Sequence, residues 1–258
     1  MNYLSPLVNV LNKSIRISGK KLIRDFSEIE KLQSSMKNID KYTTISISNL
    51  EKDICDFLRK IKPNLAIHRN HNIEDDDCWI INPIDSRRNF SRGIDNFFIT
   101  ISLRERKKIT TSIFYNPVKD ENYYFQKGMG GYRNDSRIRV SEKKKLYESI
   151  FTFYNNENHK DESEILGELR ALLKKKHFET RESGSIYCDL CFLGSGKIDC
   201  ILLYNPLLTL KEVSYLILSE TGGILTETIF LGKKIYIASN KSIGKLIKEM
   251  IENKYEKY

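Results

Sequence analysis

The sequence predicts a mixed α/β (α+β) fold in which two β-sheets lie between layers of helices. Three patterns along the 258 residues lead to this prediction. Apolar residues first recur at helical intervals, then short apolar segments follow one another with only turns between them, and finally strands alternate with helices. Hydrophobic residues make up 40% of the chain and aromatic residues 10%, which is enough for a packed core.

The N-terminal part of the chain predicts two amphipathic helices. Pro6 directly after Ser5 is typical of a helix start, and apolar residues then recur at helical spacing. Ser48 and Glu51 have the spacing of a capping box, which predicts that the second helix begins there. The expected helices span residues 5–26 and 48–61.

The middle of the chain predicts a sheet. Its apolar segments are separated by turns such as Asn116-Pro117 and the glycine-rich residues 128–131, with no helix between them. Strands joined by short turns pair in antiparallel fashion, so we expect this part of the sheet to be mainly antiparallel. The expected strands span residues 65–68, 78–84, 97–103, 109–115 and 123–126.

The remaining chain alternates between strand and helix patterns, which predicts a second sheet. Ser163 is expected to cap the first helix of this half. The expected strands span residues 147–154, 178–181, 198–204 and 235–238, and the later helices span 183–193, 210–219 and 243–255. The best boundary lies near residues 141–146, so the chain divides into 1–145 and 146–258, which we expect to form one compact unit.

Charge, cysteines and hydropathy narrow the class of protein. The net charge of +9 permits contact with nucleic acid or an acidic partner without requiring it. The five cysteines are odd in number and lie in apolar segments, which favours free buried thiols in a reducing compartment. No apolar run approaches the roughly 20 residues of a membrane span, and the N-terminus lacks the pattern of a signal peptide. We therefore expect a cytoplasmic protein with no membrane contact.

One motif points to a known family. Residues 79–90 read WIINPIDSRRNF, which resembles the signature of the inositol monophosphatase family, Trp followed by Asp-Pro-Ile/Leu-Asp-Gly-Thr and then Asn-Phe. Two further blocks agree in order and spacing: RESGS at 181–185 and SETGG at 219–223. The resemblance covers nearly the whole chain and is strongest to the bacterial extragenic suppressor (SuhB) branch. It implies a layered αβαβα sugar-phosphatase-like fold and a magnesium-dependent phosphomonoesterase.

The positions that the resemblance assigns to metal binding have changed. The four main carboxylates of the family correspond to Asn70, Asn82, Asp85 and Leu210. Of these four positions, Asp85 alone has a carboxylate side chain. Magnesium requires oxygen ligands, and carboxylates are the usual ones. Arg87 stands where the family has a neutral threonine and adds positive charge. We expect no tightly bound cofactor, with magnesium held weakly through Asp85 at most.

The altered turn suggests an anion site instead. Ser86 could cap the helix that follows while backbone N–H groups and Arg87 or Arg88 face a phosphate-bearing ligand. Gly184 and Ser185, in the second block, are the other candidates for substrate or anion binding. In the alternative interpretation, Ser86 is only a cap and Arg87, Arg88 and Arg92 pair with nearby acids.

Three other features are expected to be structural. His68 and His71 beside Asp75–Asp77 include zinc-ligand types, but a solvated acidic loop is the simpler interpretation. Cys188 and Cys191 have CxxC spacing inside an apolar helix, which favours core packing. The lysine-rich C-terminal helix is expected to be a solvated face.

These observations lead to a catalytically impaired family member that serves as a binding or scaffold protein. The resemblance implies a homodimer that associates with the transcription machinery, RNA polymerase or its elongation factors. The alternative is a magnesium-dependent phosphomonoesterase acting on inositol monophosphate or a similar sugar phosphate. A generic basic RNA-binding protein is a third hypothesis, and it rests on charge alone.

Overall fold

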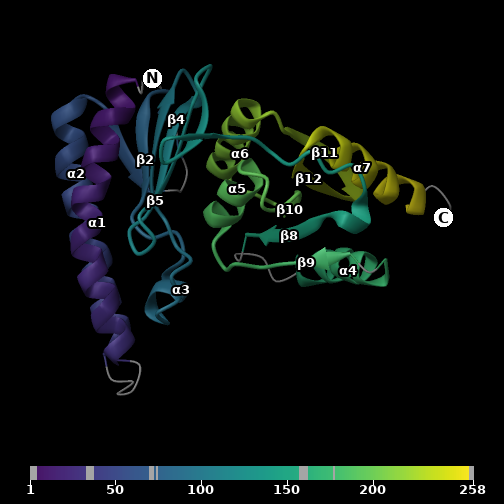
Figure 1. Cartoon of the computed structure of the whole chain (residues 1–258), viewed down its shortest axis with the longest axis horizontal. Coiled ribbons are helices and arrows are strands. Elements are labelled where there is room, and N and C mark those ends of the chain that lie inside the picture. The colour runs from purple at the N-terminus through teal and green to yellow at the C-terminus, as the bar shows by residue number, and fades with distance from the viewer. Residues whose placement is uncertain are drawn as a thin grey trace. The chain divides into compact units, whose positions relative to one another are not determined.

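The computed structural model describes residues 5–32, 38–69, 73, 75–156, 162–176 and 178–255. The chain forms two compact units, each built around a β-sheet flanked by helices (Figure 1). Unit 1 comprises Met1–Lys127, Tyr132–Arg137 and Ser183–Cys188, and unit 2 comprises Gly128–Gly131, Ile138–Glu182 and Asp189–Tyr258. The predicted mixed α/β class with two sheets is confirmed.

The first sheet has seven strands in chain order and is covered by the N-terminal helices. Its strands are β1 (Ala66–Arg69), β2 (Cys78–Asn82), β3 (Ile99–Glu105), β4 (Lys108–Asn116), β5 (Glu121–Gln126), β6 (Gly130–Arg133) and β7 (Ser136–Ile138). The helices are α1 (Pro6–Leu32), α2 (Ile39–Ile61) and α3 (Arg87–Ser91). Strand β1 runs parallel to β2, whereas β2 to β5 are antiparallel as predicted.

The two long helices begin differently from one another. Ser5 accepts a hydrogen bond from the Val8 N–H at 3.3 Å, so the predicted start of α1 is confirmed. The predicted start of α2 at Ser48 is wrong, because the helix begins at Ile39 after Asn38, which adopts a left-handed conformation with φ 76°. Ser48 lies inside the helix, and Glu51 pairs with Arg69 instead of closing a capping box.

Three aromatic rings fix the short helix α3 to the core of unit 1. Phe90 of α3 lies edge-on to Phe97, with ring centroids 5.2 Å apart, and Phe26 of α1 packs against both rings. All three rings are buried in the cluster formed by the apolar faces of α1, α2 and the sheet. Because α3 directly follows Ser86, this packing also holds the turn between β2 and α3 in place.

The second sheet has five strands in the order β11-β12-β10-β8-β9. They are β8 (Ile150–Asn155), β9 (Glu179–Thr180), β10 (Cys200–Tyr204), β11 (Ile224–Phe230) and β12 (Lys233–Ser239). The helices are η1 (Leu146–Glu148, a 3-10 turn), α4 (Glu162–Lys175), α5 (Ile186–Gly194), α6 (Leu208–Thr221) and α7 (Lys241–Tyr255). Strands β9 and β10 each run parallel to β8, whereas β12 runs antiparallel to both of its neighbours, β10 and β11.

Several expected boundaries in this half are corrected. Residues expected to start the strand at 147 form the turn η1, and β8 begins at Ile150. Helix α4 begins at Glu162, so Ser163 lies inside it and not at its cap. Helix α5 begins at Ile186, because residues 183–185 form the turn that precedes it.

The cysteines lie in apolar surroundings, as the sequence predicts. All five cysteines are free; Cys55 is partly buried and the other four are buried. Among the described helices, none is both long and apolar enough to cross a bilayer.

Candidate functional site

The turn that carries the family motif is tied to the strand beside it. Strand β2 ends at Asn82, which pairs with Thr100 of β3. Three residues later the Asp85 N–H donates to the Phe98 carbonyl at 3.1 Å. The backbone of the turn therefore runs alongside the residues at the start of β3. These backbone contacts fix the position of Asp85.

Both carboxylate oxygens of Asp85 accept hydrogen bonds within unit 1. Oδ1 accepts from the Phe98 N–H at 2.7 Å, and Oδ2 accepts from the Ser185 hydroxyl. Burial raises the pKa of Asp85 to about 6, against the opposing effect of these bonds and of the Ser86 and Tyr187 N–H groups. The one retained acid of the motif is thus partly exposed and accepts hydrogen bonds on both carboxylate oxygens.

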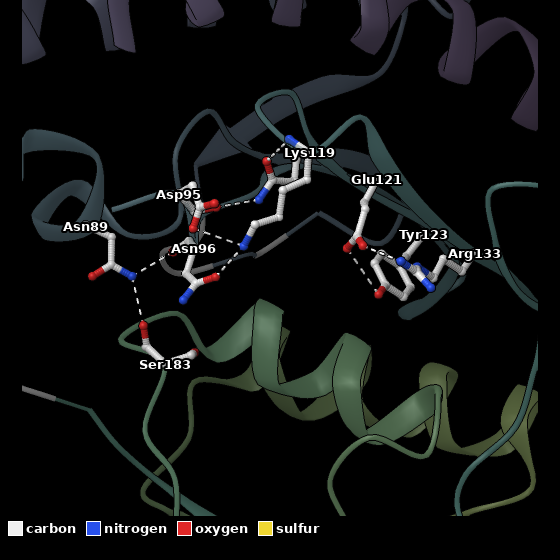
Figure 2. Close-up of polar contacts among 9 residues, drawn as sticks. Asn89, Asp95, Asn96, Lys119, Glu121, Tyr123, Arg133 and Ser183 are labelled. Atoms are coloured by element: carbon white, nitrogen blue, oxygen red, sulfur yellow. Dashed lines mark hydrogen bonds and ion pairs between the residues drawn. The ribbon is translucent and has the colours of Figure 1, made fainter. Parts of the chain in front are cut away.

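Asn89 of α3 joins the same two parts of the chain. Its amide nitrogen donates to the Asn96 carbonyl at 2.6 Å and to the Ser183 carbonyl at 2.9 Å (Figure 2). A Cβ atom on Gly184 would lie 2.9 Å from Asn89 Oδ1, and Gly184 has φ +77°. Glycine is therefore required here both for its conformation and for the close approach.

Ser185 connects this arrangement to α5. The residue is 2% exposed, and its Oγ accepts from the Cys188 N–H at 3.0 Å while the hydroxyl donates to Asp85. Ser185 therefore caps the first turn of α5, which belongs to unit 1. We refer to Asp85, Asn89 and residues 183–185 as the clamp.

The predicted anion-binding residues have other contacts. Ser86 Oγ accepts from the Asn89 N–H at 3.3 Å, so Ser86 caps α3. The Arg87 guanidinium donates to the Asp40 carbonyl at 3.1 Å and to Thr44 Oγ1 at 2.7 Å, which holds it against α2. Arg88 is exposed. Anion binding by this turn remains a prediction.

The expected ion pairs of this turn are not found in the described part of the chain. None of Arg87, Arg88 and Arg92 pairs there with an acid. The arginines of this motif therefore differ in role, because Arg87 holds α2 while Arg88 and Arg92 remain at the surface.

Two of the other positions assigned to metal lie among the described residues. Asn82 is partly buried at the end of β2, and Leu210 is 2% exposed in the first turn of α6, in unit 2. Asn70 lies outside the described residues, as does His71 of the possible zinc pair. Within the described ranges, no group of three or more His, Cys, Asp or Glu side chains could hold a metal ion. His68 instead pairs with Asp75 at 2.6 Å.

A polar network beside the clamp was not predicted from the sequence. Lys119 Nζ lies 3.0 Å from Asp95 Oδ1 and 2.7 Å from Asn96 Oδ1 (Figure 2). Asn116 donates to the Asp95 carbonyl at 2.7 Å and accepts from the Lys119 N–H at 3.0 Å. This network fixes the loop that offers its Asn96 carbonyl to Asn89. The Asn-Phe pair at the end of the first motif was the one sequence signal that pointed to Asn89.

The third family block is structural as well. In unit 2, the Glu220 carboxylate accepts from the Gly128 N–H at 2.9 Å and from the Gly130 N–H at 2.8 Å. A Cβ on Gly223 would lie 2.8 Å from the Ser239 carbonyl oxygen, so this glycine allows close backbone packing. The block therefore holds the glycine turn at 128–130 through Glu220 and allows the chain at Gly223 to pack closely against Ser239.

The chain is similar in sequence and fold to proteins of one family. The family model described as "Inositol monophosphatase family" matches residues 5–252. An inositol-1-monophosphatase of Rhizobium meliloti is 28% identical, covering 96% of this chain and 97% of that protein. A protein named Nus factor SuhB in Haemophilus influenzae is 26% identical, covering 96% and 95%. The structure of extragenic suppressor protein SuhB from Bartonella henselae matches with a TM-score of 0.77 at 25% identity, covering 96% and 100%.

Proposed function

Because the chain belongs to the inositol monophosphatase family, we propose that it is a SuhB-like member with impaired phosphatase chemistry that acts as a binding or scaffold protein. The observation that carries this proposal is the engagement of Asp85. Its Oδ1 accepts a hydrogen bond from the Phe98 N–H and its Oδ2 accepts one from the Ser185 hydroxyl. A cation would have to compete with both of these donors for the carboxylate.

The donor chemistry of the other positions supports the same proposal. Asn82 offers a neutral amide, and Leu210 offers only aliphatic carbon inside a buried helix turn. Magnesium prefers oxygen donors and usually draws on carboxylates. The described residues therefore do not fit a magnesium cluster, and we assign no reaction step to a bound metal.

The names of similar proteins support a role in transcription. Relatives in Haemophilus influenzae, Pasteurella multocida and Vibrio cholerae carry the name Nus factor SuhB. We infer a similar partner for this chain, RNA polymerase or an elongation factor, and a cytoplasmic homodimer as the functional form. Such a role depends on surfaces and not on the metal positions, so it is compatible with their loss.

An enzymatic function is the second candidate. The proteins of Rhizobium meliloti and Mesorhizobium japonicum named inositol-1-monophosphatase are each 28% identical to this chain. In this alternative, the chain is a magnesium-dependent phosphomonoesterase for inositol monophosphate or a similar sugar phosphate. Asp85 would be its essential acid and would have to leave the clamp to act.

One assay separates the two candidates. The purified full chain is incubated with excess Mg²⁺ and inositol 1-phosphate or other phosphomonoesters, beside its Asp85→Asn variant and the Rhizobium meliloti relative as a positive control. We expect turnover by the relative and no Asp85-dependent turnover by this chain. Clear turnover that the variant loses would establish the enzyme. A pull-down with purified RNA polymerase and elongation factors tests the scaffold role, and absence of binding to all of them would contradict it.

A further inference from the structure

In unit 2, Ser141 is the meeting point of three segments that are distant in the sequence. Its hydroxyl donates to Asp199 Oδ1, and Asn240 Nδ2 donates both to Ser141 Oγ and to the Lys143 carbonyl, each at 3.1 Å. Asp199 and Asn240 are each 5% exposed, so these bonds are largely shielded from water. They fix the segment around residue 141 beside the residue before β10 and the start of α7.

A fourth contact brings in the loop after α5. Gly196 has φ +71°, and a Cβ at this position would lie 3.1 Å from the Ser141 nitrogen and 3.2 Å from the Arg139 carbonyl oxygen. Lys197 therefore follows a residue that is in close backbone contact with the same segment. One region of unit 2 is therefore formed by three segments: the connecting segment 139–145, the 195–199 loop and the N-terminus of α7.

This region carries an excess of positive charge. Glu142 and Glu148 are its exposed acids, and Glu148 is shared by Lys143 at 3.8 Å and Lys145 at 3.5 Å. We call its six exposed cations, together with Tyr147, the basic surface: Arg139, Lys143, Lys144, Lys145, Lys197 and Lys241.

Three of these cations have no acid partner in the described part of the chain. They are Arg139, Lys144 and Lys241, which come from two different segments. The buried Asp199 cannot compensate for them at the surface, because Ser141 and the Ile150 N–H already bind its two oxygens. The positive charge is therefore available to a polyanion.

An exposed aromatic ring lies beside one of these cations. The Tyr147 residue is 68% exposed, and Lys145 Nζ lies 5.5 Å from the centroid of its ring. Cations that contact phosphates beside an aromatic ring that stacks on a base are the usual combination in proteins that bind single-stranded nucleic acid. An acidic peptide would pair with the lysines but would gain little from an exposed ring.

We propose that the basic surface binds single-stranded nucleic acid, with its cations on the phosphates and Tyr147 stacked on a base. This inference does not depend on the proposed scaffold role. It follows from the charges and contacts of unit 2 alone. Its test measures the binding of RNA directly and involves no protein partner.

The test uses the full chain and a labelled single-stranded RNA of mixed sequence, with binding followed by fluorescence anisotropy over a range of salt concentrations. The first variant is Arg139→Ala/Lys144→Ala/Lys241→Ala. Its matched control is Lys174→Ala/Lys175→Ala/Lys233→Ala, which removes three exposed lysines elsewhere in unit 2. We expect the first variant to bind at least about tenfold more weakly and to lower the salt slope by about 2, since each phosphate contact contributes about 0.7. The control should bind like the wild type.

A second variant separates stacking from charge. Tyr147→Ala should weaken binding by roughly 5- to 150-fold, the usual range for one stacked base, and leave the salt slope unchanged. Equal losses in the first variant and its control, or no loss in Tyr147→Ala, would overturn the proposal. Displacement of the RNA by polyglutamate of equal charge at equal concentration would also overturn it and would assign the surface to acidic proteins. Thermal melting of each variant confirms that it is folded.

Discussion

The carboxylate of Asp85 accepts a hydrogen bond from the hydroxyl of Ser185, 100 residues further along the chain. Ser185 in turn caps the first turn of α5. The contact joins the first and second family blocks, so that segment 183–188 belongs to unit 1 although its neighbours on both sides belong to unit 2. Asp85, which the resemblance assigns to metal binding, thus forms a hydrogen bond that links two segments of the chain.

The hydrogen-bonded carboxyl of Asp85 should make the stability of the chain depend on pH. Its pKa in the folded chain is about 6, above the ordinary value of 3.8, so the folded state binds this proton more tightly than the unfolded state. The free energy of unfolding therefore increases as pH falls from 7 to 4 and decreases as pH rises through 6. Relative to Asp85→Asn, the wild type should gain about 1–3 kcal/mol of unfolding free energy on acidification from pH 7 to 4.

Urea unfolding of both proteins at several pH values in this window measures that difference. Other titrating groups cancel, because they are common to the two proteins. Parallel stability profiles would show that the Asp85 carboxyl is solvated and not held in the clamp.

The close approach at Gly184 gives a second prediction. Gly184→Ala places a Cβ 2.9 Å from Asn89 Oδ1 and also requires φ +77°. Gly232→Ala is a matched control, because Gly232 has φ +73° with nothing within 4 Å of its Cβ position. The control should cost about 1–2 kcal/mol of unfolding free energy from backbone strain alone. Gly184→Ala should cost at least about 1 kcal/mol more, in line with overpacking of a tight site, and equal costs would contradict the clamp.

The elements that the sequence predicts correctly are those in which periodicity reports burial. Leu11, Ile15 and Leu22 recur on one face of α1, and all are buried. Strand β11 was missed because its residues ILTETIF mix polar side chains with apolar ones, as suits the edge of the second sheet. The start of α2 was misplaced because Ser48 and Glu51 match a capping box by spacing, although both residues also occur inside helices.

The candidate site shows the same limit. The motifs located Asp85 and Ser185 one at a time, but nothing in their local sequence indicates that they touch. Their contact depends on the pairing of β2 with β3 and on the turn before α5, which are long-range features of the fold. The role of Asn89 was hidden for the same reason, since its partner Ser183 lies in the other half of the chain.

Glu220 should control the order of the glycine turn in unit 2. Its carboxylate accepts from the N–H groups of Gly128 and Gly130, and hydrogen bonds to a charged acceptor contribute about 1.5–3 kcal/mol. Glu220→Ala should therefore lose a similar amount of unfolding free energy and speed hydrogen exchange at both glycine amides. Glu249→Ala is the control, because among the described residues Glu249 forms only an exposed ion pair with Lys245 at 3.8 Å. Unchanged exchange at residues 128–130 in Glu220→Ala would contradict this role.

Magnesium should leave the stability of the chain unchanged. A ligand that binds only the folded state at 100 times its dissociation constant adds about 2.7 kcal/mol of unfolding free energy. In a protein of this size that would raise the melting temperature by roughly 5–10 °C. Since Asp85 is engaged by Phe98 and Ser185, and Leu210 has no donor atom, we expect a shift below about 1 °C between excess EDTA and millimolar Mg²⁺. The Rhizobium meliloti relative, melted under the same conditions, serves as the comparison protein. A shift of several degrees in this chain that Asp85→Asn abolishes would show that Asp85 leaves the clamp to bind metal, and it would favour the enzymatic alternative.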